Sequence, residues 1–314
     1  MSGNAAGMLS RHGSTPFPAD KGRAAGAPAV RRRTRHWRRW VTAAVFLLPA
    51  FVALLMLRVV PTVEAVTLAL GDGERVGTWE NFEAIFTDPL FTGSLRTTLL
   101  FGVIINPLQI ALALFLAVVL TQRIPLVGLW RTLILLPVAV PQVVSAIVWL
   151  VLLRPDGPLN SFLERFGMPS VPWLINPRYA LWSIIIVCSW VGVGYWMTFL
   201  VAGIQEIPRS LYEAAEIDGA GTLRRFRHIT LPGVRRQLLF VLVADTVANF
   251  LVFAPVRILT QGGPARSTDL VMHNIFERAY TLGDLQSASA ATIVLVLILL
   301  VVVSIQFRLL PGKE

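Results

Sequence analysis

Long apolar stretches alternate with shorter polar segments along the chain. Six of these stretches have about twenty residues or more, the length that an α-helix needs to cross a bilayer. They lie at about 41–60, 95–120, 132–153, 179–204, 237–260 and 286–309. The pattern predicts an all-α integral membrane protein with six transmembrane helices. Pro49 is expected to kink the first helix, and Pro137 and Pro141 break the third.

The composition supports this class. Apolar residues make up 55% of the 314 residues and charged residues 15%, whereas soluble domains carry about a quarter charged residues. The net charge of +10 comes largely from the tail and alternate loops, so we expect membrane lipid as a partner and no nucleic acid. The single cysteine, Cys188, excludes an internal disulfide.

The distribution of basic residues predicts the topology. The first forty residues, the turn 122–131, the segment 205–236 and the C-terminal end together hold 19 of the 28 Lys and Arg. Since basic residues concentrate in cytoplasmic loops, we expect a multi-pass protein of the plasma (inner) membrane with both termini and 205–236 in the cytoplasm.

Residues 1–40 are rich in Gly, Ala, Ser and Pro and end in a cluster of arginines. Because they hold too little apolar surface for a core, they are predicted to form a disordered basic cytoplasmic tail. A cleaved signal peptide is the less favoured alternative, since 41–60 is long enough to span the membrane. Residues 41–93 would then form the first transmembrane helix and an acidic external loop.

The segment 205–236 is a charged island between two apolar stretches. Pro208 suits the first turn of a short helix and Gly219 its end. Thr222 would cap a second short helix, which Pro232 would end. The pattern predicts a compact cytoplasmic knob, or alternatively a solvated loop at the lipid headgroups. A narrow apolar stripe at helical spacing comprises Ile207, Leu211, Ala214 and Ala215.

The island also carries a motif. Glu213-Ala214-Ala215, Gly219 six residues after the glutamate, and Ile229-Thr230-Leu231-Pro232 resemble the EAA loop of binding-protein-dependent ABC importer permeases. Leu136-Pro137, Gly157-Pro158-Leu159-Asn160 and Gln261-Gly262-Gly263-Pro264 are similar to carbohydrate-type permeases, especially the first permease of the maltose and glycerol-3-phosphate importer group. The resemblance covers about 80–309 and leaves out the tail.

The resemblance implies a type I ABC importer permease fold (MetI-like), with a core at 94–309 and the coupling loop at 205–236. In that family the loop sits in a cleft of a cytoplasmic ATPase subunit. The residues expected to couple this chain to the ATPase are Glu213, Ala214, Ala215, Asp218, Gly219, Ile229, Leu231 and Pro232.

The same resemblance implies four partners: a second, homologous permease, two cytoplasmic ATPase subunits and an extracytoplasmic solute-binding protein. The chain has no GxxxxGK[ST] phosphate loop, no HExxH and no GxSxG, and its four histidines share no ligand spacing. We therefore expect no catalytic residue, no metal site and no cofactor bound by this chain, with ATP used by the partner subunits.

Three residues are candidates for a substrate site. Asp245 is the only acid well inside an apolar stretch, and Asn249 lies on the same helix face four residues later. Tyr195 follows Gly192 and Gly194, which either open the helix or let neighbours approach. By resemblance, all three occupy offsets from Glu213 that match the family's mid-membrane sugar site. The alternative role for Asp245 is a polar contact between helices.

An aromatic face beside amide and carboxylate acceptors suits a polyhydroxy ligand, so we predict import of a di- or oligosaccharide or a polyol. Glycerol 3-phosphate or glycerophosphodiesters are the alternative, although Asp245 would repel a phosphate. An ATP-independent secondary transporter and a membrane-embedded enzyme are more remote alternatives, because the sequence shows neither a relay of intramembrane charges nor a cluster of catalytic residues.

Overall fold

The computed structural model describes residues 31–71, 77–122 and 124–309. It divides into two units, one ending at Val59 and the other beginning at Val60. The first contains α1 (Arg31–Leu54) and a π-helical turn, Leu55–Val59. The larger helices of the second unit are α2 (Val60–Ala69), α3 (Glu80–Thr87), α4 (Pro89–Leu120), α5 (Val127–Leu135), α6 (Gln142–Leu152), α7 (Pro158–Arg165), α8 (Pro177–Gln205), α9 (Arg209–Ile217), α12 (Arg235–Phe250) and α15 (Leu285–Leu309). The shorter ones are α10 (Thr222–Arg225), α11 (Leu231–Gly233), α13 (Ala254–Leu259) and α14 (Val271–Phe276).

The start of the first helix corrects the prediction for the tail. The helix begins at Arg31, so residues 31–40 belong to it, and residues 1–30 lie outside the described residues. Neither glycine nor proline occurs between Arg31 and Leu48, so no residue in this segment favours ending the helix. The external loop also begins later than predicted, because helix continues to Ala69. The loop itself contains a short helix, α3.

In the described part of the chain, five helical segments are long and apolar enough to cross a membrane, which agrees with five of the predicted spans. They are Trp40–Ala69, Pro89–Leu120, Pro177–Gln205, Arg235–Leu259 and Leu285–Leu309. The remaining span is a pair of helices, Val127–Ala139 and Gln142–Leu152, bent by 99°. Pro137 and Pro141 explain the bend, since proline lacks a backbone donor and disfavours helix at the residue before it.

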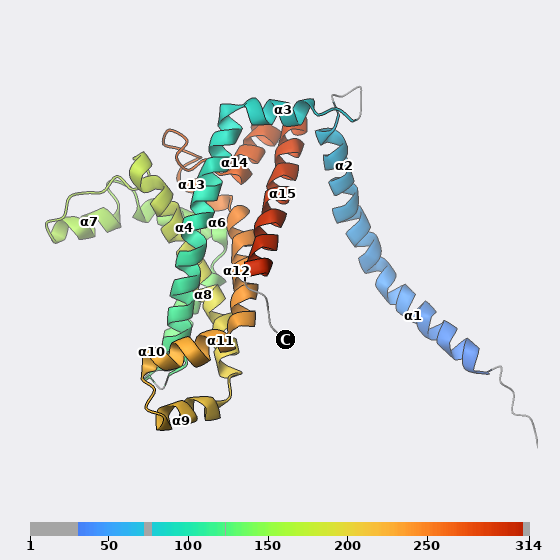
Figure 1. The fold of residues 1–314 in the computed structure, drawn as a ribbon. Helices are drawn as coiled ribbons and strands as arrows, with labels where there is room; N and C mark the ends of the chain where they lie inside the picture. Colours follow the sequence, from blue (N-terminus) through green and yellow to red (C-terminus); the bar gives the residue numbers. More distant parts are fainter. Residues whose placement is uncertain (1–30, 72–76, 123, 310–314) are drawn as a thin grey trace, which may run out of the picture. The chain divides into compact units, whose positions relative to one another are not determined.

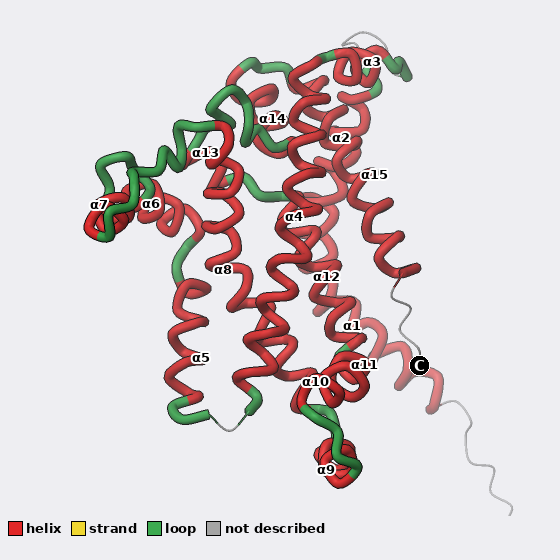
Figure 2. The backbone as a smooth tube through the Cα atoms, turned by 60° about the vertical axis from the view of Figure 1, so that its left-hand side comes forward, coloured by secondary structure: helices red, strands yellow, loops and turns green. Residues whose placement is uncertain are grey.

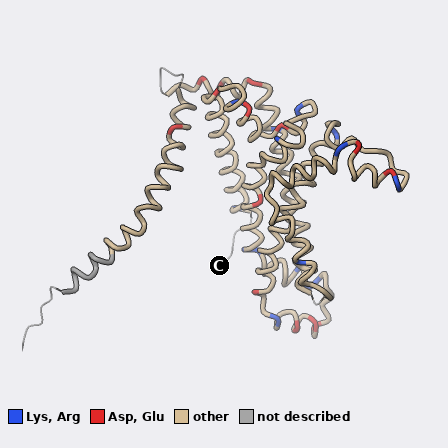
Figure 3. Tube along the Cα trace, turned by 180° about the vertical axis from the view of Figure 1, so that it is seen from behind, with Lys and Arg blue, Asp and Glu red and all other residues tan. Residues whose placement is uncertain are grey.

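Within the second unit, α4, α8 and α12 pack against one another (Figures 1 and 2). Glycines permit the close approach of neighbouring chains. A Cβ on Gly102 would lie 2.9 Å from Phe250 Cε2, and one on Gly194 would overlap the carbonyl oxygen of Ile134. Gly194 therefore acts as predicted, by letting α5 approach α8. The charged residues of this unit gather at its two ends (Figure 3), as expected for a bundle that crosses a membrane.

The loop between α6 and α8 is held by Asn160. Its side chain is 1% exposed. Its amide nitrogen contacts the carbonyl oxygens of Arg154, Pro155 and Val171 at 3.0–3.3 Å. Its oxygen accepts from Val171 N and Trp173 Nε1, both at 3.0 Å. One buried side chain thus closes both ends of the loop.

Asn160→Ala should destabilise the protein by about 2 kcal/mol or more, because several buried backbone groups lose their partner. Asn176→Ala is the matched control, since this half-buried cap accepts a single bond from Arg178 N and should cost about 1 kcal/mol. Melting temperatures in detergent compare the two variants. Equal melting temperatures would show that Asn160 does not hold the loop.

Candidate functional site

The predicted knob is present as two short helices joined at a glycine. Helix α9 ends at Ile217, Gly219 takes φ +71°, and α10 begins at Thr222. Two details differ from the prediction: Gly221 is the N-cap and Thr222 the first helical residue, and Pro232 lies within α11 instead of ending the second helix. A residue with helical backbone angles cannot aim its hydroxyl at the first free N–H groups as an N-cap does.

The surface of the knob is open. No residue of α9 is buried, and Ile217 and Leu223 are 87% and 79% exposed. Leu211 and Ala214 of the apolar stripe are exposed, while Ile207 and Ala215 are half-buried. Glu213, Asp218, Gly219 and Pro232 are exposed, while Ile229 and Leu231 are half-buried. The EAA residues thus lie at the surface or at the base of the knob, and their role in coupling stays a prediction.

The knob is fixed to the two long helices that flank it. Tyr212 Oη and Thr230 Oγ1 are 3.0 Å apart, and Arg225 pairs with Glu216 at 3.5 Å. At the base, Gln237 Nε2 donates to Glu206 Oε2 at 2.9 Å, which ties the start of α12 to the end of α8. These polar contacts add little stability each, but they join α9 to the segment 222–230 and α8 to α12.

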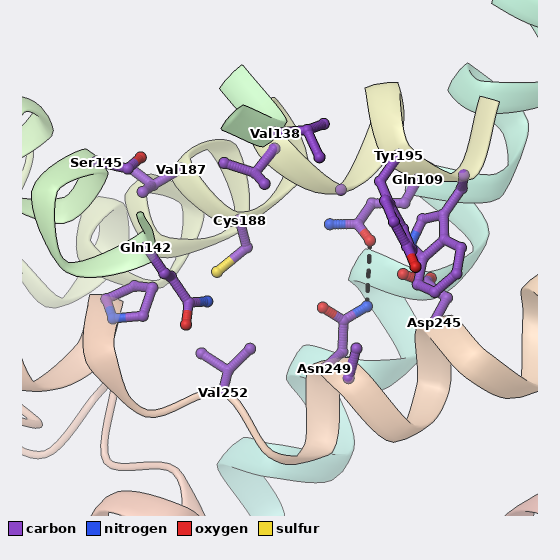
Figure 4. A pocket seen from close by; sticks show the side chains of 15 residues that line it. Gln109, Val138, Gln142, Ser145, Val187, Cys188, Tyr195, Asp245, Asn249 and Val252 are labelled. Carbon is purple, nitrogen blue, oxygen red and sulfur yellow. Dashed lines mark hydrogen bonds between the residues drawn. The ribbon is translucent and has the colours of Figure 1, made fainter. Parts of the chain in front are cut away.

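A second feature is a cavity of about 390 Å³ among α4, α6, α8 and α12. Tyr195, Asp245 and Asn249 all line it (Figure 4). Asp245 and Asn249 are buried, whereas Tyr195 is partly exposed. The structure therefore brings together the three side chains predicted for a substrate site. Their binding role remains a prediction.

Gln109 of α4 lies between the two polar residues of α12. In the orientation drawn, its Oε1 accepts from Asn249 Nδ2 at 3.2 Å (Figure 4). With its amide turned over, its nitrogen donates to Asp245 Oδ1 at 2.5 Å and its oxygen accepts from Ser189 Oγ at 3.3 Å. A carboxylate only accepts hydrogen bonds, so the second orientation satisfies Asp245 Oδ1, but it also sets the amide nitrogens of Gln109 and Asn249 3.2 Å apart without a bond between them. Asp245 Oδ2 is buried without a hydrogen-bond partner among the described residues.

Several lining residues were not predicted. They are Gln109, Gln142, Ser145, Cys188 and Trp196. Gln109 could have been found, because Asn106 and Gln109 are intramembrane amides three residues apart and share a helix face. Gln142 gives no such signal, since only the bend between α5 and α6 brings it to the cavity.

Three residues outside the lining of this cavity bring ligand-type atoms together. Asp269, His273 and Glu277 place donor atoms within 4.8 Å of one another, although the sequence suggested no ligand spacing. His273 Nδ1 lies 2.9 Å from Asp269 Oδ1. The guanidinium of Arg266 lies 2.8 Å from Asp269 Oδ2 and 3.9 Å from Glu277 Oε2. Because Arg266 already supplies the positive charge, we assign no metal there.

Gly219→Ala should loosen the turn of the knob by about 1 kcal/mol, because φ +71° strains any residue with a Cβ. Gly221→Ala is the control: both glycines have open space around them, and Gly221 has φ −65°. Limited proteolysis of the folded protein should cut the knob of the Gly219 variant faster. Equal cleavage rates in both variants would contradict this.

Comparison with known proteins agrees with the geometry. A match to the family described as "binding-protein-dependent transport system inner membrane component" covers residues 109–313. The sn-glycerol-3-phosphate transport system permease protein UgpA of Pectobacterium atrosepticum is 33% identical over 74% of this chain and 80% of its own length. The sulfoquinovosyl glycerol transport system permease protein SmoG of Agrobacterium fabrum is 30% identical over 88% and 95%.

A solved structure supports the same fold. It is a bacterial alginate ABC transporter in complex with an alginate pentasaccharide-bound periplasmic protein. The matched chain is 22% identical to this one, with a TM-score of 0.78. The match covers 88% of this chain and 96% of the solved chain. The chain therefore belongs to the family of inner membrane components of binding-protein-dependent transport systems, and it is an ABC importer permease.

Proposed function

We propose that this permease imports a neutral polyhydroxy solute, a carbohydrate or polyol, using ATP hydrolysed by partner subunits. The observation that carries the proposal is the cavity in which Tyr195, Asp245 and Asn249 converge on helices that the knob joins. Buried carboxylate and amide oxygens accept from hydroxyl groups, and an aromatic ring packs against the apolar face of a sugar.

The knob is the proposed docking element for an ATPase. Its exposed Ile217 and Leu223 offer apolar contacts, and Glu213 and Asp218 offer acceptors for polar groups of a partner. Together with a second homologous permease, two ATPase subunits would complete the importer. The knob and both termini would then lie in the cytoplasm, which the positive-inside distribution supports.

A solute-binding protein on the opposite side would deliver the solute. The alginate transporter was solved with its periplasmic protein bound, and the family is defined by such a partner. ATP binding would close the ATPase subunits, move the knobs and turn the cavity outward, where the binding protein releases its ligand.

The UgpA relative favours a second candidate, sn-glycerol 3-phosphate. The charge of the cavity argues against it. Among the described residues, its lining contains Asp245 and neither lysine nor arginine, and a phosphate is repelled by a carboxylate that no cation neutralises. Neutral carbohydrates or polyols therefore fit this chain better.

Glu213→Lys should abolish uptake of the transported solute and loosen the ATPase, because it reverses the charge at the proposed contact. Glu164→Lys is the control, since Glu164 is also exposed but lies on α7, away from the knob. Uptake and the amount of ATPase that co-purifies with the permease provide the readouts. Full uptake by the Glu213 variant, or no co-purifying ATPase with the wild type, would refute the docking role.

Asp245→Asn should improve binding of sn-glycerol 3-phosphate by about fivefold or more, because it removes a charge repulsion of about 1 kcal/mol or more. Competition against a bound neutral sugar, in the assembled complex without the solute-binding protein, measures the change. Asp156→Asn is the control on the exposed loop. If the anion competes equally in all three proteins, the carboxylate does not determine the charge of the substrate.

A further inference from the structure

We infer that Thr246 and Asn106 are positioning residues that hold the amide of Asn249 with its oxygen toward the cavity. The wall formed by α12 then presents acceptors only, and the solute must donate hydroxyl protons to it. The inference rests on the proposed function and adds the group of the solute that is recognised.

Thr246, which is fully buried, determines which groups donate and which accept in this hydrogen-bond network. Its hydroxyl donates to the carbonyl oxygen of Leu242 one turn earlier, at 2.7 Å. A hydroxyl has a single proton, so Thr246 Oγ1 can only accept from its other neighbours. Two amides donate to it, Asn106 Nδ2 at 3.1 Å and Gln306 Nε2 at 2.7 Å.

The orientation of the Asn106 amide in turn fixes the orientation of the Asn249 amide. Since the nitrogen of the Asn106 amide faces Thr246, its oxygen faces the other way and accepts from Asn249 Nδ2 at 2.8 Å. If the Asn249 amide were turned over, its oxygen would face the oxygen of Asn106, and no proton would lie between the two acceptors. Asn249 Oδ1 therefore points away from α4, toward the side of the cavity where Gln142 and Cys188 lie (Figure 4).

A second acceptor lies one turn away on the same helix. Asp245 Oδ2 has no hydrogen-bond partner among the described residues, and neither orientation of Gln109 supplies one. Leaving a buried acceptor unpaired is costly, so a donor brought by the solute is favoured at both Asn249 and Asp245. The hydroxyl groups of a sugar or polyol can supply both donors.

Thr246→Val tests the inference because it keeps the shape of the side chain and removes the acceptor. Asn106 then loses the group that fixes its direction, and Asn249 can turn its nitrogen to the cavity. Thr292→Val is the matched control: Thr292 donates to Ala288 O one turn earlier in the same way but lies outside the cavity lining. Thr246→Ser restores the hydroxyl.

The assembled wild-type importer is first tested for uptake of ¹⁴C-labelled maltose, sorbitol and sn-glycerol 3-phosphate. The neutral probe taken up best is then measured by equilibrium binding to the assembled complex in nanodiscs without the solute-binding protein. We expect Kd to rise about fivefold to tenfold in Thr246→Val. It should stay within twofold of wild type in Thr292→Val and Thr246→Ser, while the maximal number of sites stays constant in all.

A Kd in Thr246→Val that equals the control overturns the inference and leaves the proposed function standing. Uptake of the anion alone, or of no probe, overturns the proposed function and the inference with it. If Thr246→Val fails to assemble, Asn106→Leu takes its place, since it keeps a side chain of similar size and removes the acceptor that holds Asn249 Nδ2. A Kd unchanged by Asn106→Leu would likewise overturn the inference.

Discussion

Lipid offers no hydrogen bonds, so every polar group inside the bundle needs a partner within the protein or in a cavity. This constraint organises the centre of the molecule. Asp245, Thr246 and Asn249 of α12 are buried and meet the amides Asn106 and Gln109 of α4. It also accounts for the bend between α5 and α6, because irregular backbone at membrane depth is tolerated beside a cavity. Val138 and Gln142 from this bend line the cavity.

The same helices connect the cavity to the surface. Tyr195 lies on α8 and Asp245 on α12, and these two helices lead directly into the knob. Contacts at the base of the knob, such as Gln237 to Glu206, hold the helices together where they enter it. A rigid element joined to both walls can move both at once. The arrangement gives a physical route by which a partner that pushes on α9 changes the shape of the cavity.

Much of the fold and of the candidate site was predictable from the sequence, and the features that were not predicted have physical causes. Apolar length alone identified the membrane-spanning segments, and Pro208 and Gly219 marked the two ends of α9, whereas Pro232 lies inside α11 and did not end a helix. Helical spacing placed Asp245 and Asn249 on one face, where the structure has them. The 99° bend was not predictable, because prolines mark a break without giving its angle. The place of Gln142 in the cavity depends on that bend. The contact between Thr246 and Asn106 depends on the packing of α12 against α4, which local sequence does not encode.

The accessibility of Cys188 tests most directly whether the knob and the cavity move together. This residue is the only cysteine of the chain and lines the cavity. In liposomes containing the importer with cysteine-free partners, a membrane-impermeant maleimide is applied to the extracytoplasmic face, without nucleotide and with ATP and vanadate. The account predicts that trapping the ATP-bound state speeds labelling of Cys188 at least about tenfold, a change of about 1.4 kcal/mol in its exposure equilibrium. Equal labelling rates in the two states would contradict it.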